Sequence, residues 1–257
     1  MLFYLGTHEP AWLEAAGVPL FVSRRRLAGR RGLPRAAAPW ALDSGGFSEL
    51  SLHGDWRTTP LSYVAEVRRF ASEVGALEWA APQDWMCEPE MVKRTGLSVR
   101  EHQRRTVTNF VELRTLAPEL PFVPVLQGWT AGDYEDCIEM YARAGVDLQC
   151  AHVVGIGSVC RRQNTMRAAL LVAELQRAGL RLHGFGFKAT GLRAAGDSLV
   201  SSDSMAWSLH ARREPPRPEC THARCSSCLP FALEWRAALL DGLPCAREAM
   251  SVRARES

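Results

Sequence analysis

In Pro39-Trp40-Ala41-Leu42-Asp43-Ser44-Gly45-Gly46-Phe47, an apolar run ends on a carboxylate, and a hydroxyl and two glycines follow at once. We predict a strand here that delivers Asp43 at its carboxyl end. Glycines have no Cβ, so backbone amides next to them can approach a flat ligand closely. The stretch therefore favours a binding site at a strand end, although Asp-Ser-Gly-Gly also forms ordinary turns.

Similar short apolar runs recur along the chain and alternate with stretches of helical periodicity. The expected strands are 2–6, 19–23, 40–47, 79–85, 122–128, 152–158, 182–187 and 199–207. The expected helices between them include 62–74, 98–116, 131–144 and 163–178. This alternation predicts parallel βα units. We therefore predict an α/β fold, a TIM-like (β/α)8 barrel over residues 1–210, with an open doubly wound sheet as the alternative.

The composition is that of a globular enzyme-sized domain with a sizeable core. Of the 257 residues 47% are hydrophobic and 23% are charged, which excludes global disorder. No apolar run approaches the roughly 20 residues that cross a bilayer. The first residues also lack the basic start of a signal peptide. We therefore expect a cytoplasmic protein without a membrane partner, in which cysteines serve as metal ligands or buried thiols.

Polar side chains and glycines gather at the predicted strand ends. In a barrel these ends form a single face, whatever their separation in the sequence. The candidates, in chain order, are Asp43, Ser44, Gly45, Gly46, Phe47, Asp84, Gln127, Gly128, Gly155, Gly157, Lys188 and Asp203. Carboxylates and carboxamides can read the edge of a planar heterocycle. Carboxyl groups also act at a glycosidic bond, as the nucleophile at its carbon or as the general acid for its leaving group. Taken singly, each Asp is also a candidate helix N-cap, and Gln127 a candidate core polar group.

As an ordered set, these residues resemble the tRNA-guanine transglycosylases. The set comprises the Asp43–Phe47 motif, Asp84, Gln127-Gly128, Gly155 with Gly157, and Asp203-Ser204. The segments 6–10, 19–26 and 155–162 are more similar to the DNA-directed relatives, the DpdA-like 7-deazapurine modification enzymes. The resemblance covers essentially the whole chain.

The resemblance implies exchange of guanine in a nucleic acid for a 7-deazaguanine such as preQ0. It implies that Asp203 is the nucleophile of a covalent enzyme–sugar intermediate and that Asp43 is the general acid and base. Asp84, Gln127, Gly128 and Gly157 would hold the purine edge, with Ser44 in the same pocket. Two displacements at one carbon retain its configuration, which suits this chemistry. The resemblance leaves the oligomeric state open, with a homodimer as the candidate because dimers are usual among relatives.

A second motif, Cys220-Thr-His222-Ala-Arg-Cys225-Ser-Ser-Cys228, follows the predicted barrel. Three thiols and an imidazole within nine residues can close a tetrahedral Zn²⁺ site with no open position, which is typical of structural zinc. We predict a zinc-binding segment with a C-terminal helix over residues 211–257, packed on the barrel. A redox or disulfide cluster is the alternative, disfavoured in the cytosol.

Arginine dominates the basic residues, since Lys93 and Lys188 are the only lysines. Arg24, Arg25 and Arg26, and the pair Arg161-Arg162, are the predicted phosphate contacts to DNA. A solvated charged face is the alternative for such clusters. Two other functions remain open, namely the same exchange on RNA and a non-catalytic zinc-stabilised barrel that binds a base or nucleic acid. A metal-dependent hydrolase barrel is disfavoured because no His-x-His stands on an early strand.

Overall fold

The computed structural model describes residues 1–159 and 166–243. Its strands are β1 (Leu2–Thr7), β2 (Leu20–Ser23), β3 (Trp40–Asp43), β4 (Leu77–Ala80), β5 (Val125–Leu126), β6 (Val154–Ile156), β7 (Leu182–Gly184) and β8 (Ser201–Ser204). Its helices are α1 (Trp12–Ala15), α2 (Arg24–Leu27), α3 (Gly46–His53), α4 (Pro60–Glu73), α5 (Pro89–Thr95), α6 (Val99–Leu116), α7 (Ala131–Arg143), α8 (Met166–Arg177), α9 (Ala189–Ala195), the 3-10 turn η1 (Gly196–Ser198), α10 (Ala206–His210) and α11 (Leu229–Asp241).

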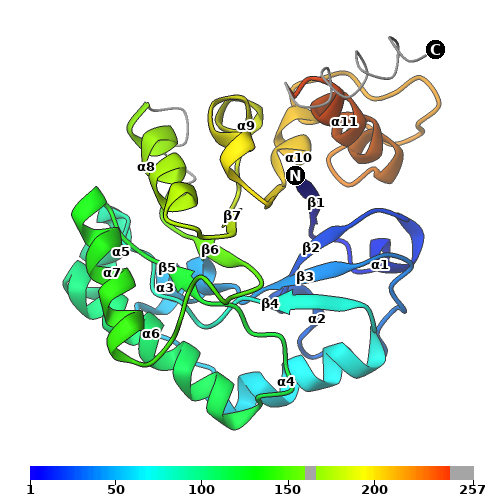
Figure 1. Ribbon diagram of the computed structural model, residues 1–257. Helices are drawn as coiled ribbons and strands as arrows, with labels where there is room; N and C mark the ends of the chain where they lie inside the picture. Colours follow the sequence, from blue (N-terminus) through cyan, green and yellow to red (C-terminus); the bar gives the residue numbers. More distant parts are fainter. Residues whose placement is uncertain (160–165, 244–257) are drawn as a thin grey trace, which may run out of the picture.

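The strands form one curled parallel sheet in the order β4-β3-β2-β1-β8-β7-β6-β5. A parallel bridge between Ala80 and Phe122 joins β4 to the segment just before β5, so the two edges of the sheet meet. Figure 1 shows the helices arranged around the outside of this sheet. The predicted α/β barrel is therefore confirmed, and the open doubly wound sheet is wrong.

Along strands such as β1 and β3, successive residues alternate between two buried layers. On β1, Leu5 faces outward into the main core that the strands share with the helices, whereas Tyr4 faces the barrel interior. The interior also contains Trp79 and Val123, with Phe21 and Phe185 packed against them. This aromatic interior forms a floor beneath the carboxyl ends of the strands.

Most strands are shorter than predicted, for local reasons. The expected strand 40–47 ends at Asp43, because Gly45 adopts the left-handed φ of 82° that begins α3. The expected strand 122–128 is reduced to Val125–Leu126, and Pro121 and Pro124 supply no N–H to a ladder there. The expected strand 199–207 ends at Ser204, and α10 takes over two residues later.

The long helices lie where their periodicity predicted them. Helix α4 starts at Pro60, inside the helix at its first turn, and the Thr59 hydroxyl accepts a hydrogen bond from Ser62 N. Helix α6 begins after Ser98, which caps it in the same way. Helix α8 begins at Met166, and residues 163–165 of the expected helix lie outside the described residues.

Helix α11 lies beside the start of β1 (Figure 1). Its Arg236 donates to the Phe3 carbonyl at 3.1 Å, and the Trp235 ring lies 6.3 Å from the Phe3 ring. Ala232 and Leu239 belong to the main core. The division into a barrel at 1–210 and a segment at 211–257 stays a prediction, and residues 244–257 lie outside the described part. Within that described part, no helix is both long and apolar enough to cross a membrane.

Candidate active site

A cavity of about 260 Å³ opens at the carboxyl ends of the strands. Its lining brings together side chains that are far apart in the sequence. They are Phe21, Asp43, Gly46, Phe47, Ala81, Asp84, Met86, Glu88, Gln127, Gly157, Ser158, Phe185, Gly186 and Asp203. Seven of the twelve predicted strand-end residues line it: Asp43, Gly46, Phe47, Asp84, Gln127, Gly157 and Asp203.

Asp84 is held by two side-chain hydrogen bonds on one wall of this cavity. Gln127 Nε2 donates to Asp84 Oδ2 at 2.6 Å, and Ser44 Oγ donates to Oδ1 at 3.3 Å. Burial raises the pKa of Asp84 to about 7, and the nearby Asp43 charge adds to that rise while the two hydrogen bonds oppose it. A carboxyl group with this pKa can present either protonation state to a ligand near neutral pH.

Asp43 lies at the end of β3, where the following turn shapes its surroundings. Its Oδ1 accepts a hydrogen bond from the Gly45 N–H at 3.1 Å, so Asp-Ser-Gly-Gly does form a turn. The same carboxylate also lines the cavity. Burial raises the pKa of Asp43; hydrogen bonds from Gly45 and Ser23 oppose the rise, and the charge of Asp203 adds to it. The two carboxylates are therefore close enough to interact across the cavity.

Asp203 is the third residue of β8 and is buried. Its Oδ1 accepts from Gly186 N at 2.9 Å and lies 3.3 Å from His183 Nε2. Neither Asp43, Asp84 nor Asp203 is the cap residue of a described helix, because Gly45 caps α3, Met205 caps α10 and no helix begins at Asp84. The helix-cap alternative is therefore wrong for all three.

Two polar cavity residues, Ser158 and Glu88, are not among the candidate site residues of the sequence analysis, although Ser158 ends the predicted strand 152–158. Ser158 has a left-handed φ of 56°, and its Oγ lies 2.7 Å from Gln127 Oε1, 2.9 Å from Glu88 Oε2 and 2.7 Å from Cys87 N. The amide of Gln127 is thus anchored at both ends, by Asp84 and by Ser158. Glu88 follows an irregular loop rather than a strand, so no pattern marked it.

Glycines beside the cavity leave room for protein side chains as well as for a ligand. A Cβ on Gly157 would lie 2.3 Å from Gln127 Nε2, and one on Gly155 would lie 2.5 Å from the Phe185 ring. Gly128 packs against Asp133 and Tyr134 in the same manner. Gly155 and Gly128 do not line the cavity, and they act on it through Phe185 and the residues of α7.

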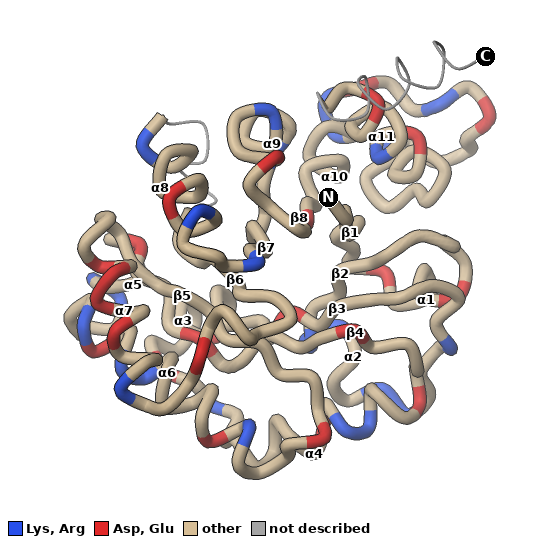
Figure 2. Tube along the Cα trace, viewed as in Figure 1, with Lys and Arg blue, Asp and Glu red and all other residues tan. Residues whose placement is uncertain are grey.

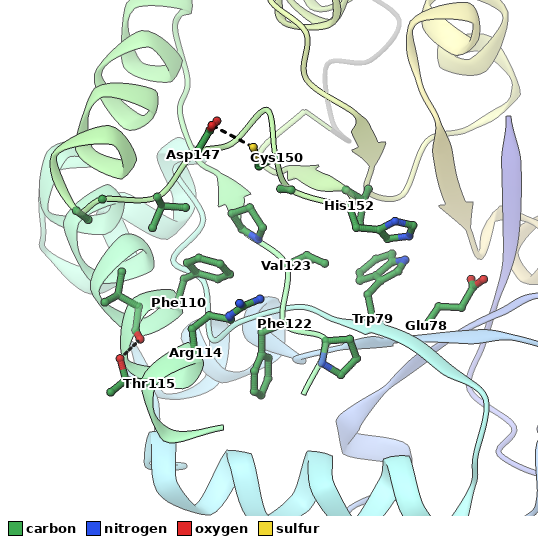
Figure 3. A pocket seen from close by; sticks show the side chains of 18 residues that line it. Glu78, Trp79, Phe110, Arg114, Thr115, Phe122, Val123, Asp147, Cys150 and His152 are labelled. Atoms are coloured by element: carbon green, nitrogen blue, oxygen red, sulfur yellow. Dashed lines mark hydrogen bonds between the residues drawn. The ribbon is translucent and has the colours of Figure 1, made fainter. Parts of the chain in front are cut away.

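A separate cavity of about 630 Å³ is lined in part by the segments that precede β5 and β6, at the amino-terminal ends of these strands. Figure 3 shows side chains that line it. Trp79 and Glu78 of β4 form one wall, and Phe110 and Arg114 of α6 form another. None of the predicted site residues lines it. The smaller cavity is therefore the candidate active site.

The Cys/His motif forms a compact cluster before α11. The ligand atoms of Cys220, His222, Cys225 and Cys228 all lie within 4.8 Å of one another. The sulfurs of Cys220 and Cys228 are 3.7 Å apart. A tetrahedral site with Zn–S bonds of about 2.3 Å needs sulfurs roughly 3.8 Å apart, so the cluster fits such an ion. The four residues can hold a metal ion.

The cluster is tied to the barrel by side-chain contacts. His8, at the carboxyl end of β1, lies 2.8 Å from Ser227 Oγ through its Nε2, and its ring stacks on Trp207. Ser208 Oγ donates to the Ser226 carbonyl at 2.9 Å. The loop that carries the ligands is therefore anchored to the end of β1 and to α10.

A family model described as "DpdA: DeoxyPurine in DNA protein A" matches residues 1–256. The chain belongs to the DpdA family. Membership marks it as a transglycosylase-type enzyme of DNA modification. A comparison with curated proteins found no match.

In this DpdA-family chain, three further predicted residues lie outside the cavity lining. Ser44 is buried behind it and donates to Asp84. Gly45 supplies the left-handed turn after Asp43. Lys188 is exposed and precedes α9, beyond the lining.

The predicted arginine contacts differ from one another in the DpdA-family structure. Arg24 is buried, and its guanidinium forms ion pairs with Glu66 and, at 3.7 Å, with Glu49. The structure thus gives Arg24 an internal partner in place of a phosphate. Arg25 and Arg26 are exposed, and Arg25 Cγ lies 3.0 Å from the position of a Cβ on Gly45. Arg161 and Arg162 lie outside the described residues.

Within residues 1–159 and 166–243, the basic positions are dispersed over the elements of the fold. Figure 2 shows Lys and Arg spread over many elements with Asp and Glu between them. The net charge of +3 agrees with this mixture. Among the described residues, the candidates for a phosphate contact are therefore single placed side chains such as Arg25.

Proposed function

We propose that this protein exchanges guanine in DNA for a 7-deazaguanine base such as preQ0 through a covalent Asp203–deoxyribose intermediate. The observation that carries the proposal is that Asp43 and Asp203 line one cavity, beside a carboxylate–amide pair that suits a purine edge. Membership of the DpdA family supports the substrate class.

The reaction consists of two displacements at C1′. In the first, an Asp203 oxygen attacks C1′, the C1′–N9 bond breaks, and Asp43 gives its proton to the departing guanine. In the second, Asp43 takes the N9 proton of the incoming base, N9 bonds to C1′, and the ester to Asp203 breaks. The configuration at C1′ is retained, and no oxidant or reductant is needed. The raised pKa of Asp43 suits an acid that must be protonated when the reaction starts.

Asp84 and Gln127 recognise the part of the base that both substrates share. Guanine and preQ0 have the same O6, N1–H and exocyclic amino group, and they differ at position 7. A carboxylate accepts from the N1–H and amino donors, as expected for recognition of a flipped base by its Watson–Crick edge. Phe47, which is 47% exposed at the cavity, offers a ring for stacking.

The non-catalytic barrel is the less favoured function. It would separate Asp43 from Asp203 or lock one of them in a salt bridge with Arg or Lys. Both line the same cavity, and the described residues give neither a Lys or Arg partner.

Zinc at Cys220, His222, Cys225 and Cys228 would supply structural stability. With four protein ligands it has no open position for a substrate, so no step passes through it. A homodimer stays a prediction, which sedimentation of the purified protein tests.

The test is exchange on matched oligonucleotides. DNA and RNA of the same sequence, each labelled in guanine, are incubated with the protein and preQ0, and release of label is followed. We expect release from DNA that requires preQ0 and is absent in Asp203→Ala. Release from RNA alone would replace the DNA assignment, and full exchange by Asp203→Ala would remove the mechanism.

A further inference from the structure

His183 lies at the centre of the barrel interior and has no part in the steps above. Its side chain is fully buried, and it occupies the middle residue of β7. A buried imidazole needs partners for both ring nitrogens. Nδ1 lies 2.9 Å from Ser201 Oγ, and Nε2 lies 3.3 Å from Asp203 Oδ1. Both nitrogens are thus paired, and one of them with the proposed nucleophile.

The partners determine which nitrogen carries the proton. A carboxylate only accepts, so the nitrogen that faces Asp203 must be the donor. Nδ1 can then accept from the Ser201 hydroxyl. The chain of donors then runs from the Ser201 hydroxyl through His183 to Asp203. A side chain that bonds the second ring nitrogen commonly fixes the tautomer in this way.

Aromatic rings hold the imidazole in place on several sides. The ring of Trp79 lies 4.6 Å from it, that of Phe185 4.8 Å and that of Phe21 5.7 Å. The Tyr4 ring lies 5.9 Å away and receives the Trp79 Nε1–H at its hydroxyl. Phe21 and Phe185 also line the small cavity, and Trp79 lines the large one (Figure 3). The cage therefore separates His183 from both cavities.

The two oxygens of Asp203 are in different surroundings. Oδ1 lies against both the Gly186 N–H and His183 Nε2. Among residues 1–159 and 166–243, none forms a hydrogen bond with Oδ2. Asp203 lines the cavity, so Oδ2 is the oxygen left for a ligand.

We propose that His183 is a positioning residue, which holds Asp203 Oδ1 through its Nε2–H so that Oδ2 is presented to C1′. The proposal rests on the proposed function in so far as Asp203 is the nucleophile. His183 touches neither the base nor the sugar. By bonding Oδ1 it fixes the carboxylate rotamer, and it stabilises the carboxylate that departs when the ester breaks in the second displacement.

The tautomer is tested without any turnover. The protein is labelled with ¹⁵N-histidine, and long-range ¹H–¹⁵N spectra at neutral pH report which ring nitrogens are protonated; His183→Gln identifies the His183 signals among those of the seven histidines. We expect a proton on Nε2 of His183. An unprotonated Nε2 overturns the proposal. This result is independent of activity, so it stands even if the protein exchanges no base.

Kinetics test the consequence for the reaction. His183→Phe keeps an aromatic ring but has no donor, and we expect kcat to fall roughly 100-fold with KM for DNA and for preQ0 unchanged. His183→Gln places an N–H near Oδ1 and should recover about tenfold of that loss. Ser201→Ala leaves the tautomer unfixed and should cost roughly tenfold.

A merely structural His183 would give a different pattern. The proposal is overturned if all three variants have the same kcat per folded molecule as the wild type. It is also overturned if His183→Gln loses as much kcat as His183→Phe. If His183→Phe does not fold, the comparison of His183→Gln with Ser201→Ala and the tautomer measurement still decide. Absence of exchange in the wild-type protein would instead count against the proposed function, whereas the spectra would still answer the question about His183.

Discussion

Gln127 Nε2 donates to Asp84 Oδ2 at 2.6 Å, so a side chain from the end of β5 holds a carboxyl group from the loop after β4. The same amide meets Ser158 Oγ through its Oε1 at 2.7 Å. The amide group of Gln127 cannot flip without losing both hydrogen bonds. The orientation of Asp84 is therefore set by the protein itself, without a ligand.

The pH dependence of stability should report the ionisation of Asp84. Its pKa is about 7 in the folded protein and 3.8 ordinarily, so the folded state binds this proton more tightly than the unfolded state. The stability it contributes is fully present below about pH 4 and is lost as the pH rises through about 7. That loss amounts to at most about 4 kcal/mol for a shift of this size.

Asp84→Asn is the matched variant, because Asn keeps an acceptor for Gln127 and never ionises. We expect the free energy of unfolding of the wild type to fall relative to the variant between pH 5 and pH 8, measured by urea denaturation. Asp43→Asn removes the neighbouring charge and should lower the pKa of Asp84. In that variant the free energy of unfolding should therefore fall at lower pH than in the wild type. Parallel curves for wild type and Asp84→Asn would contradict a raised pKa.

Asp43→Asn should also alter the pH–rate profile of base exchange. In the proposed reaction Asp43 is protonated at the start, so the kcat of the wild type should fall as the pH rises through the raised pKa of Asp43. The variant cannot give up a proton in this way, and we expect a kcat lower by about 10²- to 10⁴-fold with no such fall. An identical alkaline limb in the variant would assign the acid to another group.

The sequence predicted the barrel and the main carboxylates because both depend on local patterns. Alternating apolar and polar runs identify the strands, and residues that follow a strand share a face in a parallel barrel. Asp43, Asp84 and Gln127 could therefore be placed together without a structure. The Cys220–Cys228 cluster was equally local, since its ligands stand within nine residues.

What depends on contacts between distant residues could not be predicted. Glu88 reaches the cavity from a loop without periodicity, and Ser158 meets it through a left-handed backbone conformation. Arg24 looked like its neighbours Arg25 and Arg26, but it pairs with Glu66, 42 residues away, in the folded chain. His183 sits in a strand that reads as apolar, and only folding brings it against Asp203.

Removing one ligand of the Cys/His cluster should lower the thermal stability of the protein. Cys228 is buried and caps α11, whereas Cys150 is exposed and outside the cluster, which makes it the control. We expect Cys228→Ser or a strong chelator to lower Tm by roughly 10 °C, because loss of a structural ion costs several kcal/mol. Cys150→Ser should leave Tm unchanged. Elemental analysis should find one zinc per chain in the wild type and none in Cys228→Ser; a full complement in that variant would exclude the site.

Arg24 and Arg25 are adjacent, but Arg24→Ala should affect the stability of the fold and Arg25→Ala the binding of DNA. Arg24 is buried against Glu66 and Glu49, so Arg24→Ala leaves two carboxylates without their partner and should destabilise the fold by about 3–5 kcal/mol. Arg25 is exposed beside Gly45 at the edge of the site, so Arg25→Ala should leave Tm nearly unchanged. If Arg25 contacts a phosphate, its loss should weaken DNA binding about equally for all sequences and reduce the slope of log K against log salt by about 1.

Fluorescence anisotropy of labelled DNA at several salt concentrations measures this slope, and thermal unfolding measures stability in the same samples. Arg26→Ala is the matched control, because Arg26 is exposed on the same short helix and is not among the nearest neighbours of Gly45. An unchanged slope in Arg25→Ala would remove Arg25 from the DNA interface. A change in Arg26→Ala as large as that in Arg25→Ala would mean that the general charge of α2, rather than one placed guanidinium, attracts the DNA.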